Sequence, residues 1–144
     1  MRIKWDGKLK IGNKLVDAEH KLIISLINAI FVILRHPEER EELIFTIDQL
    51  SKFSKEHFEN EEKLQIQCQF PHYMENKLGH QKLLLELNNI RDSFDNLVNI
   101  SDKRSEAYND EAKRLAKLLQ NWFVVHILKS DMKMKGYLPI SSDQ

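Results

Sequence analysis

The sequence predicts an all-α protein, an up-down-up-down four-helix bundle with an extended N-terminal lead-in. Glycine and proline are scarce, with four and three among 144 residues, which favours a few long helices over many short strands. Apolar side chains recur with helical spacing in four successive segments. Except near 99–104, the expected connections are short, and long helices joined by short loops assemble as an antiparallel bundle.

The apolar stripes and the prolines predict where the helices begin and end. Pro37 separates the first stripe from the second, and Pro71 lies where a third helix would begin, a position that tolerates proline well. Residues 1–16 form the lead-in, and we expect the indole of Trp5 to pack on the bundle. The spacing predicts helices over 17–35, 39–66, 72–98 and 105–130.

Composition excludes several classes of partner. Lys plus Arg and Asp plus Glu each number 22, so the formal net charge is zero, and no basic surplus indicates nucleic acid or an anionic membrane. The length fits one domain. The charged N-terminus lacks a signal-peptide core, and the longest apolar run, 22–34, is shorter than the roughly 20 residues that span a bilayer. With the lone Cys68, which fits a reducing compartment, these features predict a cytoplasmic protein.

Histidines are the residues of most chemical interest. The sequence holds six of them, and every predicted helix contributes at least one. His57 and Glu61 are four residues apart, so their side chains point the same way from one helix. His126 and Asp131 are five apart, about 500° around a regular helix, so this pair requires a helix end or a local distortion near Asp131.

Histidines and carboxylates from facing helices are how bundle cores hold metal ions. Imidazole with carboxylate suits iron, manganese or zinc, and two carboxylates for four imidazoles suggest bridges between two cations. Each feature alone has an ordinary explanation, such as a packed core histidine or a solvated glutamate-rich helix face. The joint pattern, one set of side chains from each of four helices, predicts a two-metal site.

Four segments spread over nearly the whole chain resemble the signatures of a known family, hemerythrin, and most closely the single-domain bacterial hemerythrins. We therefore interpret residues 1–144 as a single hemerythrin-like domain. The segments are Ile11-Gly12 with 16–22 and Asn28; His57-Phe58-Glu59-Asn60-Glu61-Glu62; Phe70-Pro71 through His80; and Trp122-Phe123 with His126 and Asp131.

The resemblance implies a non-haem di-iron centre whose irons are bridged by Glu61, Asp131 and an oxo or hydroxo group. One iron would be bound by His20 and His57. The other would be bound by His80 and His126.

The resemblance implies the family's reaction, which is reversible binding of dioxygen. In the family, dioxygen binds at the iron that has only two histidine ligands, which corresponds here to the iron held by His20 and His57. Trp122 and Phe123 are assigned to the wall around the cofactor. Phe123 stands where the family usually has leucine, which would narrow or reshape the dioxygen pocket.

One ligand position departs from the family pattern, because Asn76 stands where the family has a histidine four residues before His80. Three alternatives follow. Asn76 or a water completes the second iron; or His72, one turn earlier, replaces the missing ligand; or the bundle binds one metal or none. We favour the first, because six of seven ligands remain and helical side chains tilt toward the N-terminus, which points His72 away.

The expected function is reversible dioxygen binding in oxygen transport, storage or delivery, with dioxygen as the small ligand. The alternative is a di-iron enzyme or sensor that handles dioxygen, peroxide or nitric oxide, because losing one imidazole leaves an exchangeable position. A third hypothesis is metal storage or a metal-free bundle. We expect His36 to cap a helix end and Cys68 to be inert.

Overall fold

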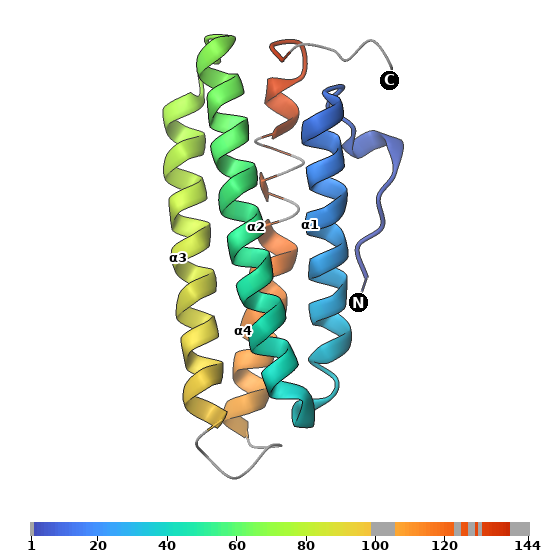
Figure 1. Ribbon diagram of the computed structural model, residues 1–144, viewed down its shortest axis with the longest axis vertical. Coiled ribbons are helices and arrows are strands. Elements are labelled where there is room, and N and C mark those ends of the chain that lie inside the picture. The colour runs from blue at the N-terminus through green and yellow to red at the C-terminus, as the bar shows by residue number, and fades with distance from the viewer. Residues whose placement is uncertain (1, 99–105, 123–124, 127–128, 130, 139–144) are drawn as a thin grey trace.

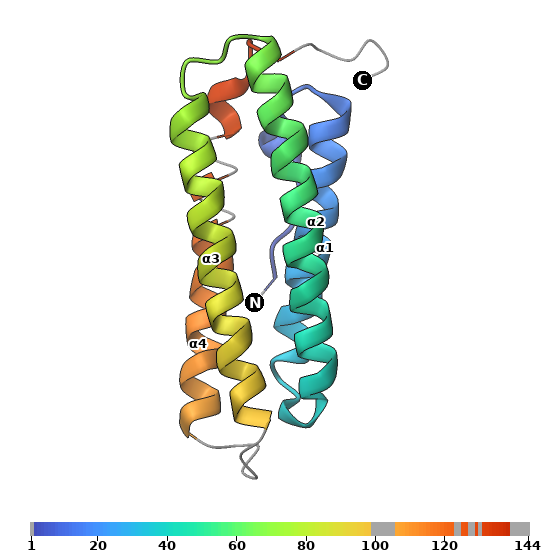
Figure 2. The ribbon, with the colours of Figure 1, turned by 60° about the vertical axis from the view of Figure 1, so that its left-hand side comes forward.

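The computed structural model describes residues 2–98, 106–122, 125–126, 129 and 131–138. Its α-helices are α1 (Lys14–Ile33), α2 (Arg40–Gln67), α3 (Tyr73–Val98) and α4 (Glu106–Asn121), and the described residues contain no strand. The four helices run alternately up and down the long axis (Figures 1 and 2). The predicted fold class is therefore confirmed, and α1, α2 and α3 lie close to their predicted ranges.

The helix ends follow from local chemistry. The side chain of Asn13 caps α1 by accepting a hydrogen bond from the Val16 amide. A short 3-10 turn, η2 (Pro37–Glu39), leads into α2, and exposed His36 precedes it just after the end of α1. No helix among the described residues has the length and apolarity needed to cross a membrane.

The C-terminus of α2 has the hydrogen bonds of a Schellman motif. The Phe70 amide donates to the Gln65 carbonyl (2.9 Å), and the Gln69 amide donates to the Ile66 carbonyl (3.2 Å). Gln69 has a φ of 55°, the left-handed conformation that this motif needs after the cap residue, Cys68. The motif reverses the chain so that α3 starts beside the end of α2.

Apolar and polar burial are divided between the two ends of the bundle. The apolar core fills the end where α1 stops and α2 begins. The buried histidines and carboxylates gather at the opposite end, where α1 and α3 begin and α2 stops. Two fully buried apolar residues, Val16 and Met134, belong to a smaller cluster at the polar end. The fully buried residues of the main core are Ile27, Ile30, Leu43, Ile47, Leu50, Leu87, Phe94, Leu115 and Leu119.

The N-terminal lead-in packs along α1 (Figure 1). The Ile3 amide donates to Asn28 Oδ1 (2.8 Å), and the Asn28 side-chain amide donates back to the Ile3 carbonyl (2.7 Å). Trp5 packs against the small cluster of Leu9 and Ile24. The predicted packing of Trp5 on the bundle is therefore confirmed.

A buried carboxylate fixes the turn that joins the lead-in to α1. Asp17 accepts hydrogen bonds from the backbone amides of Ile11 (2.9 Å) and Gly12 (3.2 Å). Gly12 has a φ of 96°, a conformation that favours glycine. These bonds hold the chain close to the first turns of α1, next to His20.

The helix predicted over 105–130 is α-helical only as far as Asn121. The described residues 122, 125, 126 and 129 have π-helical geometry, and a 3-10 turn, η4 (Asp131–Met134), follows. A π-helical turn takes in one more residue than an α-helical turn, because its hydrogen bonds span five residues. This is the local distortion that the five-residue spacing of His126 and Asp131 required.

Replacing Asn28 with alanine should release the lead-in. The variant loses both hydrogen bonds to Ile3 and should lose about 1–2 kcal/mol of stability, with faster hydrogen exchange of the Ile3 amide. Urea denaturation and NMR-detected exchange measure the two effects. Ser25→Ala is the control, because the Ser25 hydroxyl bonds only its own helix at an exposed position. Unchanged exchange at Ile3 in Asn28→Ala would contradict this account.

Candidate metal centre

Of the seven residues predicted to bind metal, the four histidines and the two carboxylates meet at the polar end of the bundle, and each is at most 6% exposed. His20 comes from the second turn of α1, His57 and Glu61 from the last third of α2, and His80 from the second turn of α3. His126 and Asp131 follow α4. The structure thus brings together the ligand set that sequence analysis predicted.

The first group of donor atoms lies between α1, α2 and η4. The shortest approaches are His57 Nε2 to Glu61 Oε2 and His20 Nε2 to Asp131 Oδ2, both 2.8 Å. His20 Nε2 also lies 3.7 Å from Glu61 Oε2. One ligand atom from each of these four residues lies within 4.8 Å of all the others. Such crowding fits one ion with bonds of about 2.0–2.2 Å.

The second group shares both carboxylates with the first. His80 Nε2 lies 3.5 Å from Glu61 Oε1, and His126 Nε2 lies 3.8 Å from the same oxygen. His126 Nε2 also lies 3.2 Å from Asp131 Oδ2. The two oxygens of Glu61 therefore face different histidine pairs, which is the arrangement of a bridging carboxylate.

The buried polar atoms of the cluster fit a pair of cations. Among the described residues, the Nε2 atoms of His20, His57, His80 and His126 and both oxygens of Glu61 and Asp131 have no hydrogen-bond partner of good geometry. Buried polar groups are normally satisfied, and each exception is costly. Imidazole nitrogens and carboxylate oxygens are also the donors that iron, manganese and zinc accept.

The electrostatics of the metal-free cluster favour protonated imidazoles beside ionised carboxylates. Burial lowers the pKa of His57, but the Glu61 charge and contacts with Glu19 and Glu61 outweigh burial and raise it to about 10. The pKa values of His20 and His80 are likewise raised, against burial, by the buried carboxylates. Burial raises the pKa of Glu61, but the neighbouring imidazoles hold it well below its usual range.

Two further carboxylates orient the histidines from outside the cluster. His57 Nδ1 lies 3.1 Å from Glu19 Oε1, and Asn60 donates a hydrogen bond to the other Glu19 oxygen (3.1 Å). His80 Nδ1 lies 2.8 Å from Glu62 Oε2. A carboxylate that accepts the Nδ1 proton leaves Nε2 free for a metal and fixes the ring.

Sequence reasoning gave Glu19 and Glu62 no separate role. Each is next to a predicted ligand, Glu19 beside His20 and Glu62 beside Glu61. This position beside a predicted ligand was the only signal that the sequence offered. Their partners could not be read from spacing, because Glu19 serves His57 on another helix and Glu62 serves His80.

Phe58 is an apolar wall inside the site that sequence reasoning did not single out. Its ring stacks on His80, with centroids 3.9 Å apart and planes at 3°, and it meets His126 edge-on at 5.1 Å. Trp122, a predicted wall residue, is buried and packs on Phe58 at 5.9 Å. Phe123, the other predicted wall residue, lies outside the described residues.

Asn76 is buried one helical turn before His80, and its Nδ2 has no hydrogen-bond partner in the described part of the chain. His72 lies elsewhere. Its side chain is 45% exposed, and its Nδ1 lies 3.4 Å from the exposed carboxylate of Glu75. This position agrees with the helix-tilt argument against His72 as a replacement ligand.

Comparison with known proteins gives a consistent family. The Hemerythrin HHE cation binding domain matches residues 12–138. A "Hemerythrin-like protein" of Naegleria gruberi is 26% identical over 134 residues, 93% of this chain and 92% of that protein. The "Myohemerythrin" of Sipunculus nudus is 27% identical with the same coverage.

A bacterial relative aligns over a smaller share of its own length. The "Bacteriohemerythrin" of Stenotrophomonas maltophilia is 25% identical over 88% of this chain and 75% of that protein. The domain match itself extends from the turn before α1 to the end of η4 and beyond, and so includes every residue of the buried cluster. This chain belongs to the hemerythrin family, whose HHE domain is a non-haem iron-binding domain.

Proposed function

We propose that this chain binds two irons and reversibly binds dioxygen, as an oxygen carrier, store or delivery protein. The observation that carries the proposal is the sharing of Glu61 and Asp131 between two buried histidine pairs. His20 and His57 would hold one iron, and His80 and His126 the other. Membership of the hemerythrin family supports iron as the metal.

The bound irons would supply the electrons and the open coordination position that reversible dioxygen binding requires. The chain's own residues do the rest. Glu19 and Glu62 orient two imidazoles through their Nδ1 atoms. Phe58 contacts the rings of His57, His80 and His126, and Trp122 packs on Phe58, so these two side chains form an apolar wall of the cluster. An apolar wall favours binding of an apolar gas over side reactions with water.

A di-iron enzyme or sensor for dioxygen, peroxide or nitric oxide is the second candidate function. The specific observation in its favour is on the His80–His126 side. There Asn76 replaces an imidazole, and a groove of about 690 Å³ between α3 and α4 is lined by both Asn76 and His126. Access of this kind would suit a ligand other than dioxygen.

Anaerobic reconstitution should load about two irons per chain, because the cluster has the donors for two ions. Adding dioxygen should then produce a visible absorption band that disappears when the gas is removed. Iron analysis and absorption spectroscopy measure these results. Glu61→Gln should lose much of the iron, whereas Glu59→Gln, at an exposed site two residues away, should retain it.

The outcomes of that experiment separate the candidate functions. Absence of iron after reconstitution would reject the di-iron proposal. Irreversible bleaching, or turnover of peroxide, would reject the carrier role and support the enzyme. Equal iron content in Glu61→Gln and the parent would reject the bridging role of Glu61.

Metal binding at pH 7 should release protons. The pKa of His57 is about 10 in the folded, metal-free protein against 6.5 for an ordinary histidine, so this imidazole is protonated at pH 7, and a metal must displace the proton. Metal affinity should therefore rise with pH up to about 10. Calorimetry in two buffers of different ionisation enthalpy counts the protons, and a count of zero would contradict the protonated cluster.

The same raised pKa gives the metal-free protein a pH-dependent stability. Because the folded pKa lies above the unfolded one, the stabilising contribution of His57 is fully present below pH 6.5 and is lost as pH rises toward about 10. Urea denaturation of the metal-free protein should thus show lower stability at the alkaline end of this window.

The substitution Asn76→His places a histidine at the position where this chain differs from the family pattern. We expect loss of iron to a chelator to slow by at least about tenfold, and autoxidation to slow as well. His72→Ala is the matched control, and its iron retention should equal that of the parent because His72 is exposed. No change in Asn76→His would show that the position is already filled.

A further inference from the structure

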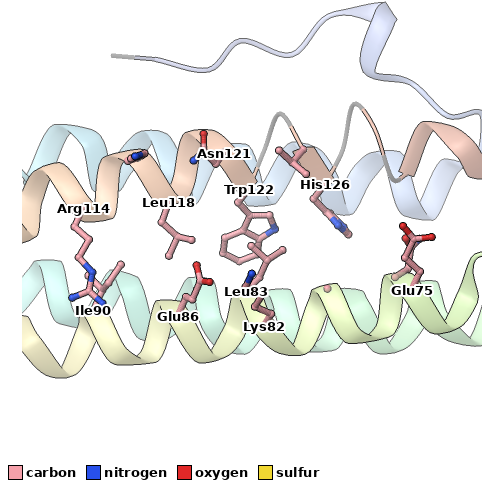
Figure 3. Close-up of a pocket in the computed structure, with 14 residues that line it drawn as sticks. Glu75, Lys82, Leu83, Glu86, Ile90, Arg114, Leu118, Asn121, Trp122 and His126 are labelled. Atoms are coloured by element: carbon pink, nitrogen blue, oxygen red, sulfur yellow. The ribbon is translucent and has the colours of Figure 1, made fainter.

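The groove between α3 and α4 is larger than dioxygen needs. Its volume of about 690 Å³ lies within the roughly 300–1,000 Å³ of sites that bind organic ligands. Figure 3 shows Arg114 and Ile90 toward one end of the groove, and His126 and Glu75 toward the other. Leu83, Leu118 and Trp122 lie between these ends and form an apolar strip, with Lys82 and Glu86 beside it (Figure 3).

One end of the groove reaches the metal cluster. His126 belongs both to the second donor group and to the groove lining. Asn76 lines the same end, is 6% exposed and presents a buried Nδ2 without a partner among the described residues. A buried amide group without a partner is a donor that a ligand in the groove could satisfy.

A glycine on α3 lines the groove close to Asn76. Gly79 lies in the interior of α3 and lines the groove, where glycine costs about 1 kcal/mol relative to alanine. A Cβ added at Gly79 would meet nothing within 4 Å, so neither packing nor backbone geometry requires glycine. A larger side chain there would instead occupy the groove next to Asn76.

The charges along the groove favour an anion. Its lining includes the cations Lys82, Arg114 and Lys117 against the carboxylates Glu75 and Glu86, a surplus of one positive charge before any metal is counted. Bound metal ions at the inner end would add further positive potential. Glu75 is the charged side chain at the inner end in Figure 3, so the bound metal ions would be what attracts an anionic group there, and a hydrocarbon body fits over Leu83, Leu118 and Trp122.

We propose that this groove binds a small organic carboxylate, with its acid group at Asn76 and the His80–His126 metal and its hydrocarbon part over Leu83 and Trp122. The inference rests on the proposed two-metal site and adds a ligand class for its second metal. It assigns Asn76 to binding of the carboxylate. It also predicts that a large side chain at position 79 would block the ligand.

The test uses hexanoate, zinc-loaded protein and the fluorescence of Trp122. Zinc has no redox chemistry, so the readout is binding alone. The chain has two tryptophans, and Trp5→Phe leaves Trp122, which lines the groove, as the only reporter. Hexanoate should change its emission saturably, with an affinity at least about tenfold higher for the zinc-loaded than for the metal-free protein. Hexan-1-ol should bind at least about tenfold more weakly than hexanoate.

Variants at neighbouring positions of α3 locate the binding. Gly79→Leu should weaken hexanoate binding by at least about tenfold. Gly79→Ala should be more stable than the parent and should weaken binding less. Gln81→Leu, at an exposed position of the same helix outside the groove, should bind hexanoate as the parent does.

The outcomes distinguish this inference from the proposed function. Failure to bind zinc and iron would overturn the two-metal site itself. Bound zinc without a saturable response to hexanoate would overturn only the groove proposal. Equal binding of hexanoate and hexan-1-ol would overturn the carboxylate class, and unchanged binding in Gly79→Leu would overturn the position.

Discussion

The burial of Glu61 and Asp131 among four imidazoles is the constraint on which the rest of the structure depends. Moving a carboxylate out of water costs several kcal/mol even after the protein relaxes, and this cluster buries two of them completely. Protons on the imidazoles, or metal ions in their place, balance that charge. The polar end of the bundle therefore depends on its counter-charges. The fold is stabilised by apolar packing, in the main core and in a smaller cluster at the polar end that consists of Ile11, Val16, Phe70, Met134 and Leu138.

The division between the two ends explains how a site so costly can be built. Isoleucine, leucine and phenylalanine side chains fill the interior at the end where α1 stops and α2 begins, and Ile30, Leu43 and Phe94 are fully buried there. That packing fixes the spacing and direction of the helices at the end of the bundle opposite the cluster. The lead-in and the turn held by Asp17 add support near His20. The donors are thus positioned by elements whose stability comes from elsewhere.

Sequence patterns predicted the helices and the six buried donors well, because helical spacing and the choice of ligand residues are local properties of the chain. They did not predict the partners of Glu19 and Glu62, since these contacts cross between helices and depend on how the helices pack. The stacking of Phe58 on His80 was missed for the same reason. The spacing of His126 and Asp131 did indicate a distortion, but not its π-helical form, which hydrogen bonding decides.

The two halves of the cluster differ in what surrounds them. On the first side, Glu19 holds His57 and the ligands are fully buried. On the second side, Glu62 contacts His80, but Asn76 is a weaker donor than imidazole, and the groove lined by Asn76, Gly79 and His126 adjoins the cluster. A lost ligand in a closed core would only weaken the metal. In the proposed two-metal site, a metal held by His80 and His126 would instead lie beside the groove that Asn76 and His126 line, so the residue at position 76 and the groove have a common physical explanation in ligand access.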